Sequence, residues 1–181
     1  MKILVIGGTG FISGRTAQKL IEKGHHVTIF TRGKSPNLLP KHPALEYIIG
    51  DRNDKRKIKA TLQHGTFDVV YDFVAYEPGE SKLAVKVFQG KVGRFIHCST
   101  ISVYMVSNEV QCPITEDQDN RPLMPFWDRN PFGMDYGIKK RQCEDNLWQA
   151  HNEQLFPVSM LRPTYVSRPN DPTERDFFWI E

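Results

Sequence analysis

The chain has 181 residues, enough for one well-buried domain and too few for two domains of ordinary size. Hydrophobic residues make up 39% of it and charged residues 25%, which is typical of a soluble globular protein. A net charge of +3 is too mild to indicate a nucleic-acid-binding surface, and no apolar run approaches membrane-spanning length. We therefore expect neither a membrane nor a nucleic acid as partner.

The cysteines and the first residues bear on the cellular compartment. Cys98, Cys112 and Cys143 are widely spaced and odd in number, which favours neither a disulfide framework nor a zinc site. No signal or transit sequence precedes the first predicted strand. We therefore expect a protein of the reducing cytoplasm that binds no metal.

A short apolar segment followed by glycines opens the chain. Residues 2–6 predict a strand buried on both faces, and Gly7 and Gly10 allow a sharp turn into a helix. Such a turn brings backbone N–H groups and the helix dipole toward one point, where a dinucleotide pyrophosphate fits. Ser13 stands in the third glycine position of this motif, with Gly14 beside it. The alternative is a tight turn that holds no ligand.

The second predicted strand, residues 26–30, completes a β-α-β unit and is followed by basic residues. NAD-binding proteins carry an acid at its end that binds the ribose 2′-hydroxyl, whereas this chain has Thr31. Threonine does not repel a 2′-phosphate, and Arg32, supported by Lys34, is suited to bind one through a forked, charge-assisted bond. We therefore favour NADP over NAD, although both basic residues are also common in ordinary loops.

The third predicted strand, residues 45–49, ends before Gly50 and Asp51. Asp51 is placed to accept hydrogen bonds from an adenine amino group, to cap the helix that follows, or to do both. Arg52, next to it, is included with the cofactor-binding residues. The densest basic run of the chain, residues 55–59, is interpreted as a solvated helix face.

Strands and helices continue to alternate along the rest of the chain. We predict strands at residues 67–75, 94–99 and 157–163, helices at residues 80–89 and 136–151, and a long polar loop at residues 106–134. Strands that alternate with helices indicate a parallel sheet. The predicted fold is therefore α/β, a Rossmann-type doubly wound parallel sheet with flanking helices.

Tyr136 and Lys140 form the candidate catalytic pair. They are four residues apart in a predicted helix and so share one face of it. A neighbouring ammonium favours the phenolate and lowers the pKa of a tyrosine toward the working range, which makes Tyr136 a candidate general acid/base. Thr100, at the end of a neighbouring strand, is placed to hold the substrate oxygen. This spacing also arises by chance. The catalytic interpretation is supported by the glycine turn and by the hydroxyl cluster upstream.

Two other polar groups are interpreted as structural. His97 lies on a buried strand and is taken as a core or strand-end histidine rather than a ligand. Glu116, Asp117 and Asp119 are taken as a solvated acidic turn rather than a metal site.

Together these motifs resemble the extended short-chain dehydrogenase/reductases, in particular the NAD-dependent epimerase/dehydratase family that acts on nucleotide sugars. The segments that carry the resemblance follow the family's order: Gly7–Ile12, Gly50–Asp51, Cys98–Tyr104, Tyr136–Lys140 with Glu144, and Leu161–Val166. The resemblance implies hydride transfer between a substrate carbon and a nicotinamide. It also implies a nucleotide sugar as substrate and NADP or NAD as cofactor, and it leaves a homodimer open.

The resemblance further implies roles for individual residues. Thr100, Tyr136 and Lys140 would form the catalytic triad, with Lys140 also bonding the nicotinamide ribose. The cofactor-binding residues expected from the resemblance and from the patterns above are Gly7, Gly10, Phe11, Ile12, Arg32, Asp51, Arg52, Val74, Ala75, Tyr136, Lys140, Pro163 and Val166.

The chain departs from the family pattern at several positions, and there it resembles the atypical branch of the family. That branch includes isoflavone-reductase-like proteins and a chloroplast RNA-binding member. Besides Ser13 and Thr31, the helix after Ala75 lacks the asparagine that commonly helps to build the site, and Arg168 stands where glycine is usual. The alternative function is therefore a protein on the same scaffold that binds NADP for sensing, or binds RNA, without turnover.

Family members continue past the sixth strand with a C-terminal portion that binds the sugar nucleotide. We expect residues 1–168 to form the NAD(P)-binding domain and residues 169–181 to begin a substrate-binding portion that is truncated and largely missing. The aromatic residues at 177–179 fit this expectation because they need a packing partner.

Overall fold

The centre of the fold is a six-stranded sheet in which all neighbouring strands are parallel. The computed structural model describes residues 1–35, 39–61, 65–125 and 134–166. The strands are β1 (Lys2–Ile6), β2 (His26–Thr31), β3 (Leu45–Ile49), β4 (Phe67–Asp72), β5 (Val92–Cys98) and β6 (Val158–Leu161). Their order, β3-β2-β1-β4-β5-β6, is that of the doubly wound Rossmann fold. The predicted fold class is confirmed.

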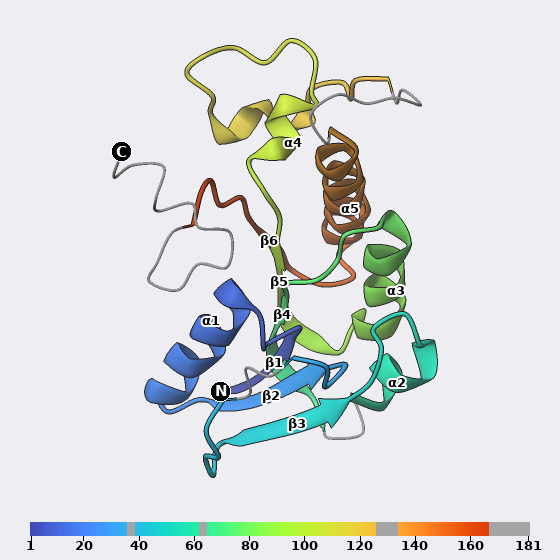
Figure 1. Ribbon diagram of the computed structural model, residues 1–181. Helices are drawn as coiled ribbons and strands as arrows, with labels where there is room; N and C mark the ends of the chain where they lie inside the picture. The colour runs from blue at the N-terminus through green and yellow to red at the C-terminus, as the bar shows by residue number, and fades with distance from the viewer. Residues whose placement is uncertain (36–38, 62–64, 126–133, 167–181) are drawn as a thin grey trace, which may run out of the picture.

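Helices cover both faces of the sheet (Figure 1). The helix α1 (Phe11–Glu22) lies on one face, whereas α3 (Pro78–Phe88) and α5 (Met134–Asn152) pack together on the other, with α2 (Lys55–Ala60) next to α3. Beyond β5 come the short helix α4 (Ser102–Met105) and the 3₁₀ helix η2 (Glu116–Asn120). Among the helices of the described ranges, none combines the length and the apolar content needed to cross a bilayer.

The strand β1 shows why the apolar N-terminal segment occupies the middle of the sheet. Ile3 and Val5 cluster with Ala17 of α1, whereas Leu4 and Ile6 belong to the larger core under α3 and α5. These alternate side chains are all buried, as predicted, and each stabilises the fold by about 1.5–3 kcal/mol. The turn that follows β1 is therefore anchored to a central strand that is buried on both faces.

Besides shifts of a few residues at element ends, the observed elements differ from the predicted ones after β4 and after β5. The strand predicted at 67–75 ends at Asp72, so Val74 and Ala75 lie in the turn beyond it. The helices α4 and η2 were not predicted, because their sequences carry no helical repeat of apolar residues long enough to detect. Arg168 and the predicted C-terminal portion, residues 169–181, lie outside the described residues.

Candidate functional site

The turn between β1 and α1 requires glycine for reasons of space. Gly7 has a φ of +86°, and a Cβ built on it would lie 2.4 Å from Cγ1 of Val74, in the turn after β4. The helix α1 begins at Phe11, so its N-terminal turn, with unpaired backbone N–H groups as a general property of helix ends, lies at the same edge of the sheet.

Ser13 stabilises this turn in a way that the missing third glycine could not. Its hydroxyl donates to the Gly7 carbonyl at 2.6 Å and accepts from the Gly10 N–H at 2.9 Å, and the residue is buried. A Cβ on Gly14 would lie 3.7 Å from the Gly8 carbonyl oxygen, an ordinary contact. The serine therefore ties the two ends of the turn together by hydrogen bonds.

Replacing Ser13 by alanine is expected to lower the free energy of unfolding by about 1 kcal/mol, because the Gly10 N–H and the Gly7 carbonyl both lose a partner. Urea denaturation measures the loss. Thr16→Ala is the matched control, since its hydroxyl bonds a carbonyl within the same helix on a more exposed side. Equal losses in the two variants would contradict the special role of Ser13.

Two adjoining pockets lie at the carboxyl ends of the strands and meet at this turn. The first has a volume of about 570 Å³ and the second a volume of about 350 Å³. Both are lined by Gly7, Gly10, Val74 and Tyr76. The glycine turn thus stands between a pocket bounded by α5 and a pocket at the ends of β2 and β3.

The predicted site residues are distributed over these two pockets. The first pocket is lined by Gly7, Gly10, Phe11, Ile12, Val74, Thr100, Tyr136, Lys140, Pro163 and Val166. The second is lined by Gly7, Gly10, Arg32, Asp51, Arg52 and Val74. Ala75 lines neither, because it is buried, and its carbonyl accepts a hydrogen bond from Lys140 Nζ at 2.8 Å.

In the second pocket, the position of Asp51 shows whether it caps the helix that follows, which was one of its expected roles. The helix α2 begins at Lys55, and its N-cap is Asp54, which accepts from the backbone N–H groups of Arg56 and Lys57. Asp51 instead accepts from the Asn53 N–H at 2.8 Å and is exposed. The capping role proposed for Asp51 is therefore wrong, because the helix starts one turn later than expected.

Arg52 lines the second pocket, but its charge is paired inside the protein. Nη1 donates to Asp72 Oδ1 at 2.6 Å, and Nη2 donates to the Glu80 carbonyl at 3.1 Å. Both charged side chains of the Arg52–Asp72 pair are buried. Although burial by itself raises the pKa of Asp72, the Arg52 guanidinium holds that pKa below its ordinary value. The short Arg52–Asp72 bond makes Arg52 a structural part of the pocket wall.

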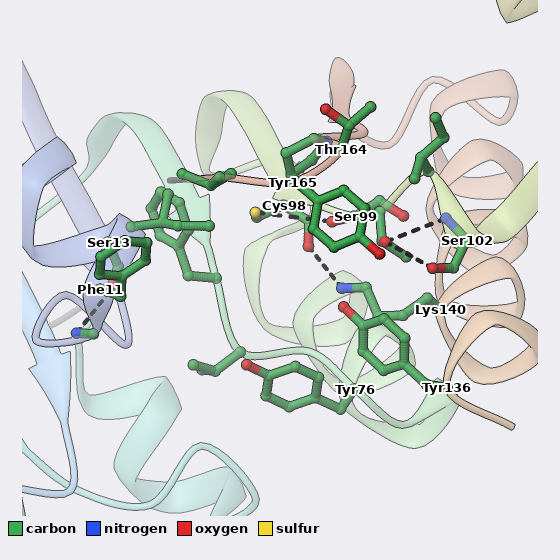
Figure 2. A pocket seen from close by; sticks show the side chains of 18 of the residues that line it. Phe11, Ser13, Tyr76, Cys98, Ser99, Ser102, Tyr136, Lys140, Thr164 and Tyr165 are labelled. Atoms are coloured by element: carbon green, nitrogen blue, oxygen red, sulfur yellow. Dashed lines mark hydrogen bonds between the residues drawn. The ribbon is translucent and has the colours of Figure 1, made fainter. Parts of the chain in front are cut away.

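In the first pocket, Tyr136 and Lys140 lie one turn apart on α5 (Figure 2). Tyr136 is 43% exposed, whereas Lys140 is 1% exposed. Lys140 Nζ donates to the carbonyls of Ala75 and Cys98, at 2.8 and 2.6 Å, and lies 3.1 Å from His97 Nε2. The ammonium is thus held by protein acceptors at the base of the pocket.

Thr100 reaches this pocket because α4 and α5 come into close contact. A Cβ on Gly137 would lie 2.8 Å from the Ser102 carbonyl oxygen, so only glycine allows α5 to approach so near. Thr100 Oγ1 donates to Ser102 Oγ and accepts from its backbone N–H, both at 3.2 Å. The predicted hydroxyl cluster is therefore assembled next to Tyr136.

The pKa of Tyr136 is shifted in the direction opposite to the predicted one. Burial and the neighbouring Tyr76 raise it above its ordinary value, and a hydrogen bond with Thr100 opposes part of that rise. The predicted lowering by the Lys140 ammonium is not observed, because removal of water from around the phenol disfavours the charged phenolate. At neutral pH the Tyr136 phenol is therefore protonated.

Tyr76 is a site residue that the sequence reasoning missed. It lines both pockets, its ring centroid lies 6.4 Å from that of Tyr136, and Lys140 Nζ lies 5.6 Å from its centroid (Figure 2). Its place directly after Ala75, at the carboxyl end of β4, was the signal that could have identified it.

The interpretation of His97 as a buried strand residue is confirmed, since it is fully buried on β5. Burial and the nearby Lys140 ammonium lower the pKa of His97 from 6.5 to about 3. Its imidazole is therefore neutral at physiological pH.

The protein should become less stable as the pH falls, because of His97. As the pH falls below 6.5, the unfolded chain gains a proton on this histidine that the folded chain takes up only near pH 3. We expect the free energy of unfolding to fall by roughly 3 kcal/mol between about pH 8 and about pH 4.5, measured by urea denaturation. The loss should be smaller in His97→Gln, and an equal loss in both proteins would contradict the assignment.

The acidic and basic clusters noted in the sequence form ion pairs or face solvent. Asp119 of η2 accepts from Arg162 Nη2 at 2.8 Å, and the same guanidinium binds the buried Glu144 carboxylate at 2.7 Å. Within the described stretches, no three His, Cys, Asp or Glu side chains gather as metal ligands would. The basic residues of α2 are exposed, as expected for a solvated helix face: Lys55, Arg56, Lys57 and Lys59.

The strand order, the glycine turn and the two pockets at the carboxyl edge define a Rossmann-type α/β domain. Residues 3–87 match the model of the NAD dependent epimerase/dehydratase family. The resemblance found in the sequence is thereby confirmed for these residues, which form a segment similar to that family.

Three known proteins illustrate the relationship. The chloroplast stem-loop binding protein of 41 kDa b from Arabidopsis thaliana is 36% identical over 98% of this chain and 46% of its own length. UDP-arabinose 4-epimerase 1 from Arabidopsis thaliana is 25% identical over 88% of this chain and 42% of its own. The Bordetella bronchiseptica enzyme WbmG, crystallised with NAD, shares the fold with a TM-score of 0.71 and 21% identity, over 90% of this chain and 52% of its own. This chain spans about half the length of the curated relatives that it matches.

Proposed function

We propose that the protein is an NAD(P)-dependent oxidoreductase of the epimerase/dehydratase kind that acts on a nucleotide sugar. The observation that carries the proposal is that two pockets meet at the glycine turn and that one of them also contains Thr100, Tyr136 and Lys140. A dinucleotide needs such a site, with its diphosphate at a helix N-terminus and its two ends on either side. The names of the UDP-arabinose epimerase and of the NAD complex support the substrate and cofactor classes.

The residues present fit a nicotinamide dinucleotide. Gly10 lines both pockets, and among the described residues only Ser13 Oγ, at 3.1 Å, lies near a Cβ built on Gly10, so the backbone is open to an approaching phosphate. When bound, the nicotinamide supplies a hydride acceptor for a substrate carbon. Gly7 and Gly10 would hold the diphosphate, and Asp51 would face the adenosine end.

The chain's own residues would manage the substrate proton. When a substrate carbon gives its hydride to the nicotinamide, Tyr136 Oη would act as the phenolate and take up the proton of the substrate hydroxyl, having first released its own proton to solvent. In the reverse step the protonated phenol, the form favoured at neutral pH, would return that proton to the substrate oxygen as the hydride comes back. Thr100 would hold that oxygen through its hydroxyl, which lies on the same pocket wall. Lys140 would keep a positive charge fixed behind the phenol, and Tyr76 would exclude water from the junction of the pockets.

The preference for NADP is tested by titrating NADP and NAD separately by calorimetry. Arg32 lines the second pocket and follows Thr31, whose buried hydroxyl accepts from the Gly33 N–H. We expect NADP to bind more tightly than NAD, and Arg32→Ala to weaken NADP by about 10- to 100-fold because a charge-assisted hydrogen bond is lost. Arg15→Ala, an exposed arginine on α1, is the control. Equal or tighter binding of NAD would refute the NADP preference, and binding of neither would refute the function.

A second function, RNA binding without turnover, is favoured by two observations. The relative with 36% identity is named a stem-loop binding protein, and the basic face of α2 is exposed. This function predicts affinity for an RNA stem-loop that falls steeply with salt and that decreases when Lys55 and Lys59 are replaced by glutamate. RNA affinity that is absent at low salt would exclude it.

Three expectations about the whole protein stay proposals: a cytoplasmic location, a homodimer, and residues 1–168 as the cofactor-binding domain. Size-exclusion chromatography with light scattering tests the second.

A further inference from the structure

A group of buried polar side chains lies behind the first pocket, between β4 and α5. Asp72 and His97 are register partners on the neighbouring parallel strands β4 and β5, and both are buried. Register partners on adjacent strands project from the same face of a sheet. On that side, His97 Nε2 lies 3.1 Å from Lys140 Nζ.

The contact with Lys140 determines which nitrogen of His97 carries the proton. An ammonium only donates hydrogen bonds, so Nε2 must accept, and the single proton of the neutral ring is then on Nδ1. Within the described residues, His97 Nδ1 has no hydrogen-bond partner, and neither has Asp72 Oδ2. One of these buried atoms is a donor and the other an acceptor, and they belong to register partners.

Buried polar atoms are almost always paired, either directly or through an ordered water. The two unpaired atoms can satisfy each other's requirement only if the Nδ1 proton is directed toward the carboxylate. The charges that face the ring agree with this arrangement. Burial, Lys140 of α5 and Arg52, after β3, disfavour a second proton on the imidazole, and the opposing attraction of Asp72 of β4 does not outweigh them, so the ring carries one proton.

We propose that Asp72 and His97 are positioning residues for Lys140. The Asp72 carboxylate holds His97 in the Nδ1–H tautomer, and His97 Nε2 then accepts the third proton of the ammonium, whose other two bond Ala75 and Cys98. Lys140 is thereby fixed by acceptors from the turn after β4 and from β5 before any ligand arrives. The part of Lys140 in turnover rests on the proposed function, whereas the tautomer does not.

The tautomer is tested without any enzyme assay. Long-range ¹H–¹⁵N spectra of the labelled protein report which ring nitrogen is protonated, and the signals lost in His97→Gln identify His97. We expect a neutral Nδ1–H ring at neutral pH, with a downfield Nδ1 proton that moves upfield in Asp72→Asn. A neutral Nε2–H ring, a doubly protonated ring, or a resonance unmoved by Asp72→Asn would overturn the proposal.

The consequence for turnover is tested with a pair of variants. In His97→Gln the amide carbonyl can replace Nε2 as acceptor, whereas His97→Leu leaves one ammonium proton unpaired. We expect turnover to fall on the order of 100-fold in His97→Leu with little change in KM, and to be largely restored in His97→Gln. Equal losses in the two variants would overturn the positioning role. If the unaltered protein shows no turnover, the proposed function fails, and the spectra still decide the tautomer.

Discussion

Replacing Tyr136 by phenylalanine is expected to reduce turnover by about 10²- to 10⁴-fold, the usual contribution of a positioned acid/base. The substitution removes only the phenol oxygen, whose raised pKa keeps it protonated at neutral pH and which lies in the first pocket near Thr100. The ring and its packing against Tyr76 remain. Binding of the cofactor, measured by calorimetry, should therefore stay nearly unchanged.

Tyr76→Phe is the matched control for this experiment. Tyr76 is a second phenol in the same pocket, and the pKa of its hydroxyl is also raised by burial. It is not on the helix face that carries Lys140, so its hydroxyl should matter much less for turnover. Retained turnover in Tyr136→Phe, or equal losses in the two variants, would contradict the assigned role.

Replacing Arg52 by leucine is expected to lower the free energy of unfolding by about 3–5 kcal/mol, because it leaves the Asp72 carboxylate buried without its partner. Arg52 Nη2 also satisfies the Glu80 carbonyl, so the variant removes a second hydrogen bond within the same wall. Urea denaturation measures the loss. Adding Asp72→Asn should recover part of it, since a neutral amide is easier to bury than an unpaired carboxylate.

Lys19→Leu is the control for the Arg52 variant. Lys19 and Glu22 form an ion pair of 2.8 Å whose side chains are about half exposed, and such an exposed pair contributes little to stability. A loss in Arg52→Leu no larger than in Lys19→Leu would contradict the view that Arg52 is structural. It would also favour the original expectation that Arg52 serves the cofactor.

The sequence by itself determined the features that depend on neighbouring residues. The apolar run before Gly7, the glycines that follow it and the alternation of strands with helices predicted the sheet, its parallel class and the turn at its edge. The spacing of Tyr136 and Lys140 placed both on one helix face. Such features are local, because hydrophobic periodicity and backbone freedom act over a few residues.

The tertiary structure alone decided which polar groups meet. Arg52 pairs with Asp72 across 20 residues of sequence, and Lys140 contacts His97 across 43, because the strand register and helix packing bring them together. Burial also reversed the predicted direction of the Tyr136 pKa shift, since it removes water from around the phenol and so disfavours the phenolate. Desolvation and charge partners are set by residues distant in the chain, and no local pattern contains them.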